Sequence, residues 1–354
     1  MKKLAFTLVL LLSLTIVQGQ KKIINIPDIH GYITLRCDFH SHTVFSDGEV
    51  WPTYRVNEAW YDGLDVLAIS DHLEYQPKKA YIPTDHNAAW KIAKNLARER
   101  NLMLIHSTEI TRSMPPGHLN ALFVEDASLI NLKDPFEAIE AAVKQGAFIQ
   151  WNHPGWKAQE KDGIPKIYDI HTKLFDKGYI HGIEFFNETE YYPHILEWCK
   201  EKDLAVIACS DIHGIISEKY GHTTRPMTLV FAEERTEGSL KEALFDARSL
   251  AYFENTLAGP EKLLKEVFNA SISVGKPYLD NDRYYWIEIS NNYDIPFILI
   301  EGPEGVSSSF TLGANSITTV RILKDKDPEL RFKVKNLLVG YEEYLEVTII
   351  NNNR

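Results

Sequence analysis

Residues 33–42, ITLRCDFHSH, run from an apolar, strand-like segment into two histidines. Apolar runs of this kind recur along the chain and indicate strands at Ile33–Phe39, Leu64–Ser70, Leu102–Ser107, Leu119–Val124, Ala147–Trp151, Gly182–Phe186 and Leu204–Cys209. Helical periodicity between several of them predicts helices at Trp51–Tyr61, Asn87–Arg100, Pro135–Lys144, Pro193–Lys202 and Leu240–Arg248. Such an alternation predicts an α/β fold with a parallel sheet covered by helices, and about seven units favour a closed barrel over an open sheet.

The chain changes character after Pro260. Short β-rich runs separated by turn-like stretches follow, at Ala270–Val274, Tyr284–Ser290, Phe297–Ile300, Ser316–Ile322 and Glu342–Ile350, and no convincing helix is evident. We therefore expect an α/β barrel over residues 20–260 and a small all-β, sandwich-like domain over residues 261–354. The second domain has no histidine, which makes it a poor candidate for chemistry.

The first 19 residues are typical of a secretory signal peptide. Lys2 and Lys3 precede the apolar run Leu4–Val17, which ends near the small residue Gly19. This run is shorter than the roughly 20 apolar residues that a membrane-spanning helix needs. We therefore expect export to the periplasm or the medium, with no membrane insertion once the peptide is cleaved.

The charge of the chain bears on its partners. Lysine and arginine number 38 and the acids 49, which gives a net charge of -11. An acidic surface repels polyanions, so nucleic acid is not expected as a partner. The three cysteines, Cys37, Cys199 and Cys209, lie in apolar runs and are interpreted as buried thiols rather than a disulfide framework.

Side chains of the types that commonly bind metal ions lie at or near the ends of the apolar runs of the first domain. They are His40, His42, Asp47, His72, Glu109, His118, His153, Asp211 and His213. In parallel α/β barrels, the loops beyond the C-terminal ends of the strands converge on one face. The sequence therefore predicts that these residues meet at one mouth of the barrel.

Spacing strengthens this prediction. His40 and His42 are two residues apart on an extended segment, so both imidazoles point to the same side and can bind one ion. Asp211 and His213 repeat the spacing after another apolar run. Glu109 would be costly if buried without a partner, and a cation would compensate its charge.

Each residue also has a simpler interpretation. Taken singly, His72, His118 and His153 are more often core or loop histidines, and Asp47 lies in a Ser-Asp-Gly sequence that is common in turns. Their joint occurrence at strand ends is what favours a metal cluster.

These residues resemble the motifs of the PHP (polymerase and histidinol phosphatase) family of phosphoesterases. The matching segments are DFHSH at 38–42, SDH at 70–72, Glu109, His118, HPG at 153–155 and DIH at 211–213, within about residues 34–260. The resemblance implies a distorted seven-stranded (β/α) barrel, TIM-like, with a cluster of two or three divalent ions such as zinc, manganese or iron. With its signal peptide and β-rich tail, the chain is most similar to exported phosphodiesterases of the Sb-PDE group.

The resemblance also implies which residues hold each ion. The first ion would be held by His40, His42, Glu109 and Asp211. Glu109 would bridge to the second, held also by His118 and His153. The third would be held by Asp47, His72 and His213. Some family members have a histidine in place of Asp47, and this difference bears on the occupancy and metal preference of the third site.

The expected reaction is hydrolysis of a small phosphate ester by a metal-activated hydroxide, since bound ions lower the pKa of water toward about 7. Glu109 and Asp211 are the candidate catalytic acids of the cluster. Arg225 is the first candidate to grip a phosphate oxygen and Arg112 the second, although either could be a salt-bridge residue. His222 is a candidate to protonate the leaving group. The few cationic clamps favour a diester over a dianionic monoester.

Two other functions remain open. Amidohydrolase-like C–N and C–O hydrolases also begin with His-x-His and end with an Asp at a strand end, but many bridge their ions with a modified lysine where this chain has Glu109. A non-catalytic binding protein could keep metals for stability, although structural zinc sites are normally closed and four-coordinate. Activity on phosphate esters and amides would separate the three.

Overall fold

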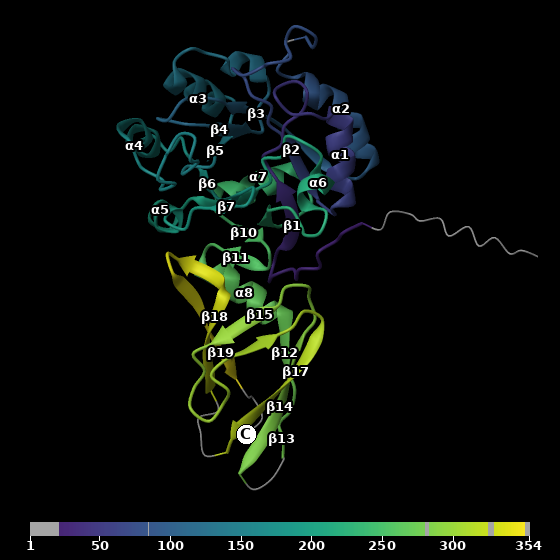
Figure 1. Ribbon diagram of the computed structural model, residues 1–354, viewed down its shortest axis with the longest axis vertical. Coiled ribbons are helices and arrows are strands. Elements are labelled where there is room, and N and C mark those ends of the chain that lie inside the picture. Colours follow the sequence, from purple (N-terminus) through teal and green to yellow (C-terminus); the bar gives the residue numbers. More distant parts are fainter. Residues whose placement is uncertain (1–20, 84, 280–282, 325–328, 351–354) are drawn as a thin grey trace, which may run out of the picture.

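The computed structural model describes residues 21–83, 85–279, 283–324 and 329–350. The signal peptide predicted at residues 1–19 lies outside them. Figure 1 shows a wide part, in which helices surround strands, above a narrower part that consists mostly of strands. We call them the α/β domain and the β domain. No helix among the described residues has the length and apolar character needed to cross a membrane.

Seven strands of the α/β domain coincide with the apolar runs of the sequence, whereas the strands at 190–191, 227–232, 249–253 and 256–258 were not predicted. The strands are β1 (Ile33–Asp38), β2 (Val66–Ile69), β3 (Met103–Ile110), β4 (Leu119–Leu122), β5 (Phe148–Trp151), β6 (Gly182–Asn187), β7 (Glu190–Tyr191), β8 (Ala205–Cys209), β9 (Met227–Ala232), β10 (Ser249–Phe253) and β11 (Thr256–Ala258). The helices are α1 (Pro52–Tyr61), α2 (Ala88–Glu99), α3 (Pro135–Lys144), α4 (Asp169–Asp176), α5 (Ile195–Lys202), α6 (Ile216–Tyr220) and α7 (Glu237–Phe245).

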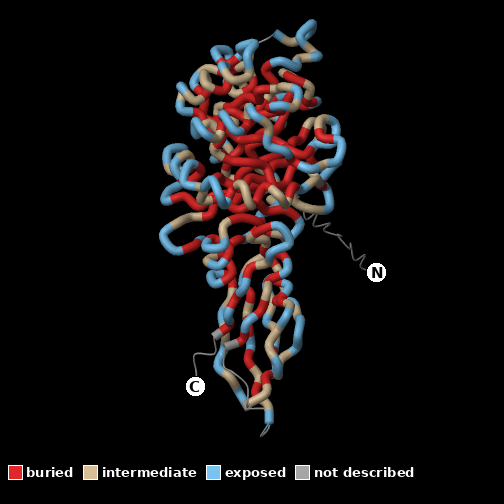
Figure 2. The backbone as a smooth tube through the Cα atoms, turned by 90° about the vertical axis from the view of Figure 1, so that its left-hand side faces the viewer, coloured by how far each residue is buried: buried red, intermediate tan, exposed pale blue. Residues whose placement is uncertain are grey.

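Local signals explain these elements. Strands β2, β4, β5 and β8 are buried along their whole length, as expected when both faces of a sheet are covered. Helix α3 begins at Pro135 directly after Asp134, whose carboxylate accepts a hydrogen bond from the Glu137 amide at 3.0 Å. Figure 2 shows the resulting burial, with the buried residues concentrated in the interior of the wide part.

The sheet of the α/β domain is mixed, which corrects the parallel sheet predicted from the sequence. Pairs β1–β2, β2–β3, β5–β6 and β6–β8 are parallel, but β4 is antiparallel to both of its neighbours, β3 and β5. The segment between β3 and β4, residues 111–118, is too short for the crossover of about a dozen residues that a parallel connection requires. Strand β9 is also antiparallel to β1.

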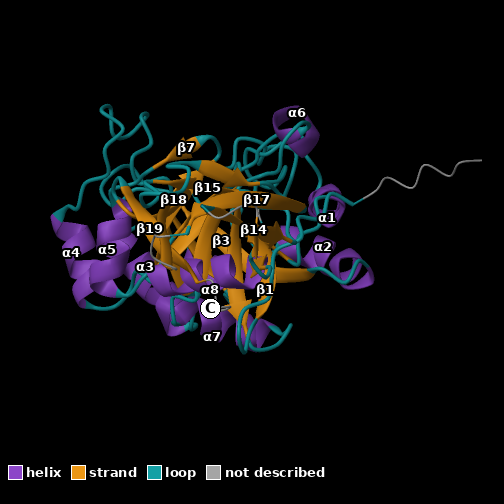
Figure 3. Cartoon of the chain, turned by 90° about the horizontal axis from the view of Figure 1, so that it is seen from below, coloured by secondary structure: helices purple, strands orange, loops and turns teal. Residues whose placement is uncertain are grey.

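The sheet curves until its distant strands meet. Leu35 of β1 and Ile207 of β8 belong to one buried cluster inside the curve. Beyond the strand ends, an isolated bridge joins Ser41 to Ile212. Among the described pairings no continuous ladder joins β8 to β1 or β9, so the closed barrel that was predicted is observed as a curved sheet whose ends are bridged at the mouth. Figure 3 shows the strands gathered centrally with helices around them.

The β domain follows helix α8 (Glu261–Ser271), which corrects the expectation that no helix occurs after residue 260. Its strands are β12 (Ile272–Val274), β13 (Tyr278–Leu279), β14 (Tyr284–Asn291), β15 (Phe297–Ile300), β16 (Phe310–Leu312), β17 (Ser316–Leu323), β18 (Glu329–Gly340) and β19 (Glu343–Ile350). Strand β14 alternates buried and more exposed residues, the pattern of a strand with one face on a core. From Ile272 onward the regular elements among the described residues are strands, so the all-β prediction is confirmed for that part of the region.

The two domains share a sheet. Strand β11 pairs with β10 on one side and, in parallel, with β18 on the other. Leu257 and Ala258 of β11 lie opposite Leu337 and Leu338 of β18. The seam between the domains is therefore hydrogen-bonded backbone as well as packed side chains.

Candidate metal centre

Nine potential ligands meet at the mouth of the curved sheet. His40 and His42 follow β1, His72 follows β2 and Glu109 lies near the end of β3. His153 follows β5, and Asp211 and His213 follow β8. His118 directly precedes β4, and because β4 is antiparallel its beginning lies at the edge where the parallel strands end. Together with Asp47, these residues form what we call the metal centre: His40, His42, Asp47, His72, Glu109, His118, His153, Asp211 and His213.

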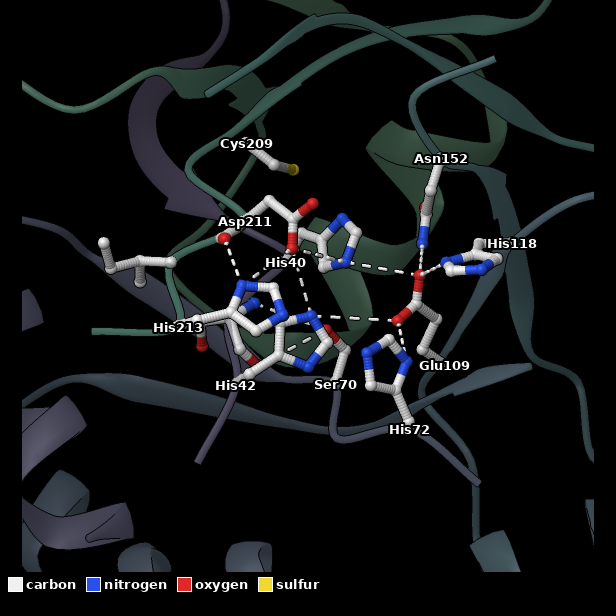
Figure 4. A network of polar contacts seen from close by, with 12 residues as sticks. His40, His42, Ser70, His72, Glu109, His118, Asn152, Cys209, Asp211 and His213 are labelled. Atoms are coloured by element: carbon white, nitrogen blue, oxygen red, sulfur yellow. Dashed lines mark hydrogen bonds and ion pairs between the residues drawn. The ribbon is translucent and has the colours of Figure 1, made fainter. Parts of the chain in front are cut away.

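Glu109 lies in the middle of the metal centre (Figure 4). One carboxylate oxygen, Oε1, is 3.1 Å from His118 Nδ1 and 3.4 Å from His40 Nε2. The other, Oε2, is 2.5 Å from His72 Nδ1 and 3.7 Å from His42 Nε2. A single carboxylate therefore contacts imidazoles from the ends of β1 and β2 and from the start of β4, the arrangement that a bridging ligand requires.

Asp211 and Asp47 extend the metal centre on two sides. Asp211 Oδ1 is 3.1 Å from His42 Nε2 and 3.2 Å from His40 Nε2, and Oδ2 is 3.9 Å from His153 Nε2. Asp47 Oδ1 is 3.4 Å from His72 Nε2 and 3.3 Å from His213 Nε2. The ligand atoms fall into four overlapping groups: His40, His42, Glu109; His40, His153, Asp211; His72, Glu109, His118; and His42, Asp47, His72, His213.

The loop that carries Asp47 is held tightly. A Cβ on Gly48 would lie 2.5 Å from the His42 carbonyl carbon, so only glycine allows the loop to fold back this closely. The buried carboxylate of Asp71 accepts hydrogen bonds from the Thr43 amide at 2.7 Å and from the Ser46 hydroxyl at 2.7 Å. These contacts fix the position of Asp47.

The residues of the metal centre fit divalent cations. His40 Nε2, Asp47 Oδ1 and Glu109 Oε2 are buried and have no hydrogen-bond partner among the described residues. Unpartnered buried polar atoms are costly, and cation coordination removes the cost. Imidazole nitrogens and carboxylate oxygens are donors that zinc, manganese and iron accept.

The acids of the metal centre draw positive charge toward themselves. Burial opposes protonation of His72, but the carboxylates of Glu109 and Asp47 raise its pKa to about 10, so that without an ion the imidazoles supply the positive charge. Burial raises the pKa of the Glu109 carboxyl, but the neighbouring imidazoles, that of His72 first, outweigh burial and hold the pKa well below its ordinary value. Burial also lowers the pKa of His42 to about 3, with His213 and His72 adding to the effect. Glu109 is thus ionised and His42 neutral, the forms that bind metal ions.

Glu184 orients two of the ligands and was not among the residues predicted. It is fully buried in β6, and its Oε1 accepts a hydrogen bond from His40 Nδ1 at 2.8 Å, which leaves Nε2 facing the metal centre. Its Oε2 accepts from the His153 amide at 2.6 Å and from Asn187 Nδ2 at 2.8 Å. An acid in the otherwise apolar stretch GIEFFN was the available signal, because such a residue is buried only with partners.

Two more side chains hold the metal centre and were also missed. Asn152 Nδ2 donates to Glu109 Oε1 at 2.9 Å. The buried guanidinium of Arg55 on α1 donates to the carbonyls of His42 and His213 at 2.9 and 3.1 Å, and so ties the segment after β1 to the segment after β8. No sequence motif marks either residue.

Two ligands have unusual backbones. His153 has φ of +26° and Asp211 has φ of +46°, in the region that non-glycine residues rarely occupy. Such conformations cost on the order of 1 kcal/mol or more and persist where surrounding contacts enforce them. The His153 amide contact with Glu184 and the hydrogen bond from the Asp211 amide to the His40 carbonyl, 3.0 Å, are contacts of this kind.

A cavity of about 570 Å³ opens above the metal centre. Candidate ligands form its floor, and the remaining lining residues are Tyr75, Thr111, Trp156, Asn187, Glu188 and Glu190. The ions implied by the donor set would therefore be accessible to a small molecule.

Arg225 does not fit the phosphate-binding role predicted for it. Its guanidinium is buried, 3.0 Å from Asp38 Oδ2 and 2.8 Å from Asp62 Oδ2, and it does not line the cavity. Asp38, at the end of β1, is fully buried and requires a cation, which explains this placement.

Arg112 and His222 are likewise not among the residues found to line the cavity. Arg112 pairs with Glu74 at 2.5 Å and donates to the Leu132 carbonyl at 2.5 Å, so its guanidinium is already engaged. His222 is exposed in the turn after α6. Neither arrangement fits the role predicted from the sequence.

Histidines and acids gathered at the strand ends of a curved α/β sheet, below an accessible cavity, form a site whose donor groups fit divalent cations. A two-domain protein containing a predicted PHP-like metal-dependent phosphoesterase from Bacteroides vulgatus has a similar structure, with a TM-score of 0.89 and 39% sequence identity. The match covers 93% of this chain and 98% of that one. The chain belongs to this family of two-domain PHP-like proteins, and the family prediction is confirmed.

Other comparisons are more distant. A putative metal-dependent phosphoesterase from Bifidobacterium adolescentis matches at a TM-score of 0.38 and 19% identity, over 50% of this chain and 87% of that one. An amidohydrolase from Chromobacterium violaceum matches at 0.39 and 14%, over 52% and 90%. The family model DUF5001, described as an Ig-like domain, matches residues 272–350. A comparison with curated proteins gives no match.

Proposed function

We propose that this protein is an exported metal-dependent phosphodiesterase that holds two or three divalent ions, zinc, manganese or iron. The observation that carries the proposal is the metal centre itself, nine ligand-type side chains beneath an accessible cavity in a PHP-like chain, three of whose buried ligand atoms have no hydrogen bond among the described residues. A purely structural metal site is normally closed, whereas this one faces an opening.

The ligand sets proposed for the ions follow the contacts described above. Glu109 is the proposed bridge because both of its oxygens contact imidazoles. Asp47, His72 and His213 form the proposed third set, and His42 lies beside them, its ring 4.2 Å from that of His213. His153 is assigned beside Asp211 and Glu109, at 3.9 and 3.8 Å.

Bound divalent ions lower the pKa of water and neutralise charge on a phosphate group. The side chains of this chain supply orientation. Glu184 fixes the tautomer of His40, and Asn152 holds the Glu109 carboxylate. Asn187, which lines the cavity, donates a hydrogen bond of 3.3 Å to Asp211 Oδ2. Arg225 and His222 have no part in the proposed reaction.

The preference for a diester rests on charge. No lysine or arginine is among the residues found to line the cavity, and its lining includes Glu188 and Glu190. A monoester dianion would bring a second negative charge against these carboxylates, whereas a diester carries one. The acidic chain likewise makes nucleic acid an unfavourable partner.

The proposal is tested with the mature protein by metal analysis and by hydrolysis of a bis(nitrophenyl) phosphodiester, a nitrophenyl monoester and a nitroanilide. We expect two or more ions per chain and faster cleavage of the diester. Glu109→Ala should lose both metal and activity, while Glu140→Gln on the surface of α3 should keep them. Bound metal with cleavage of the nitroanilide alone would favour an amidohydrolase instead.

Export is proposed from residues 1–19 and is tested separately. N-terminal sequencing of the protein from culture medium and periplasm should find a chain that begins near residue 20. A chain that retains Met1 in the cytoplasm would contradict export without affecting the proposed reaction.

A further inference from the structure

The cavity above the metal centre has a wall that the proposed reaction does not use. Trp156 lies there with 40% of its surface exposed, and Tyr75, which is 53% exposed, also lines the cavity. The Trp156 ring is 5.3 Å from that of His153, and the Tyr75 ring is 6.0 Å from that of His72. Two large aromatic rings thus stand beside the ligands, open to whatever occupies the cavity.

Glu190 brings a negative charge to the same wall. It pairs across the β6–β7 hairpin with Asn187, and directly opposed residues of an antiparallel pair project to the same face. Asn187 contacts Asp211 of the metal centre, so this face of the hairpin is the one that looks into the cavity.

The two carboxylates of the hairpin differ in how they are compensated. Glu188 forms an ion pair with Lys219 at 2.5 Å. Glu190 accepts a hydrogen bond from the Tyr192 hydroxyl at 2.7 Å, and no ion pair with a cation is found for it among the described residues. Glu190 therefore brings an uncompensated negative charge to the cavity wall.

Trp156 and Glu190 are connected through Tyr192. The hydroxyl of Tyr192 donates to Glu190, and its ring packs so closely on the Trp156 loop that a Cβ on Gly155 would lie 2.9 Å from it. The relative position of the aromatic ring and the carboxylate is thus set by a buried residue between them.

We propose that this wall binds an alkylammonium group, so that the substrate is a phosphodiester one of whose alcohols carries a positive charge, such as a choline or ethanolamine ester. This inference rests on the proposed phosphodiesterase function. Aromatic faces attract ammonium ions through their quadrupole, and a carboxylate that forms no ion pair adds charge attraction. A neutral sugar or planar ring could stack on Trp156 but would gain nothing from the charge of Glu190.

The test compares two diesters with the same nitrophenyl leaving group and the same single phosphate charge. One is nitrophenyl phosphocholine, and the other is its neutral isostere, in which a quaternary carbon replaces the nitrogen. We expect kcat/KM to be about tenfold higher for the choline ester. Glu190→Gln keeps the hydrogen-bond acceptor for Tyr192 and should remove most of this preference, mainly through the choline ester.

The outcomes are distinguishable. Equal rates for the two esters, or an equal loss of both in Glu190→Gln, would overturn the ammonium site while leaving the phosphodiesterase intact. Glu188→Gln is the matched control, because its charge is already paired, and it should change the preference little. If neither ester is cleaved, the proposed function fails, and calorimetric binding of phosphocholine against its carbon isostere still decides the ammonium site.

Discussion

Two buried charge clusters lie within a few residues of each other at the end of β1 and are balanced in opposite ways. Asp38 is neutralised by Arg225, a cation of the protein that also contacts Asp62; we call these three residues the Arg225 cluster. Two residues further on, His40 begins the metal centre, where the acids face imidazoles rather than a lysine or arginine and three ligand atoms have no hydrogen bond among the described residues. Buried acids that the protein balances itself stabilise the fold, and those it leaves unbalanced mark the site.

The largest expected effect comes from breaking the metal centre. Glu109→Gln removes the central carboxylate charge but keeps its shape, and metal catalysis contributes several kcal/mol, so activity should fall at least about a thousandfold. Metal content per chain and diester hydrolysis measure it, with circular dichroism to check folding. A variant that keeps its ions and its rate would show that Glu109 is not the bridge.

Breaking the Arg225 cluster should instead cost stability. Arg225→Met leaves the buried Asp38 carboxylate without its cation, and the free energy of unfolding should fall by about 3–5 kcal/mol. Adding Asp38→Asn to the same chain should recover part of the loss. Denaturant unfolding measures both. A large fall in kcat/KM with an unchanged unfolding midpoint would instead support the substrate-binding role first predicted for Arg225.

The partners of the ligands should have an intermediate effect. Glu184→Gln weakens the hydrogen bond that orients His40, and such changes typically lower metal affinity or activity by about 10- to 100-fold. Titration of the metal-free protein with zinc or manganese gives the affinity. Unchanged affinity and rate would mean that His40 is oriented by packing alone.

The smallest expected effect concerns His181, a partly buried histidine. Unlike the acids of the two clusters, it is kept neutral by burial rather than balanced by a charge. Burial lowers the pKa of His181 to about 4, whereas the unfolded chain has an ordinary value near 6.5. The unfolded state therefore takes up the proton first, and the contribution of His181 to stability is complete above about pH 6.5 and is lost as the pH falls toward 4.

His181→Asn tests this linkage. The Ile149 amide donates a hydrogen bond of 2.9 Å to His181 Nδ1, and the side-chain carbonyl of an asparagine can accept that hydrogen bond without titrating. Between about pH 6.5 and 4 the variant should lose about 2 kcal/mol less stability than the parent chain. Unfolding midpoints across this range supply the measurement. Parallel curves for the two chains would contradict the low pKa.

The sequence predicts the ligands better than it predicts their supports. Each ligand except Asp47 lies beside a strand that apolar patterning reveals, so its place at the mouth follows from chain direction alone. His118 reaches the mouth only because β4 is reversed, and the short segment before β4 carried that information. Glu184, Asn152 and Arg55 depend on contacts between distant segments, which no local pattern encodes.

The errors have physical explanations as well. Arg225 lies in a polar turn-like sequence that looks exposed, and only the fold reveals that Asp38 needs it. Helix α8 was missed although Leu264, Val267 and Phe268 are spaced to bury one face and Glu261 follows Pro260 at the start. The helical spacing of apolar residues was present in this segment, but the β-rich sequence that follows it led to a prediction without a helix.

The parallel pairing of β11 with β18 bears on how the α/β domain and the β domain evolve. Leu257 and Leu337 are both fully buried along that seam, so an α/β domain ending at residue 260 would present an open apolar strand edge of the kind that natural proteins cover. A gene rearrangement that replaced the β domain would have to supply a strand of matching register at the same place. The β domain is therefore expected to evolve together with the α/β domain rather than to be replaced by an unrelated domain.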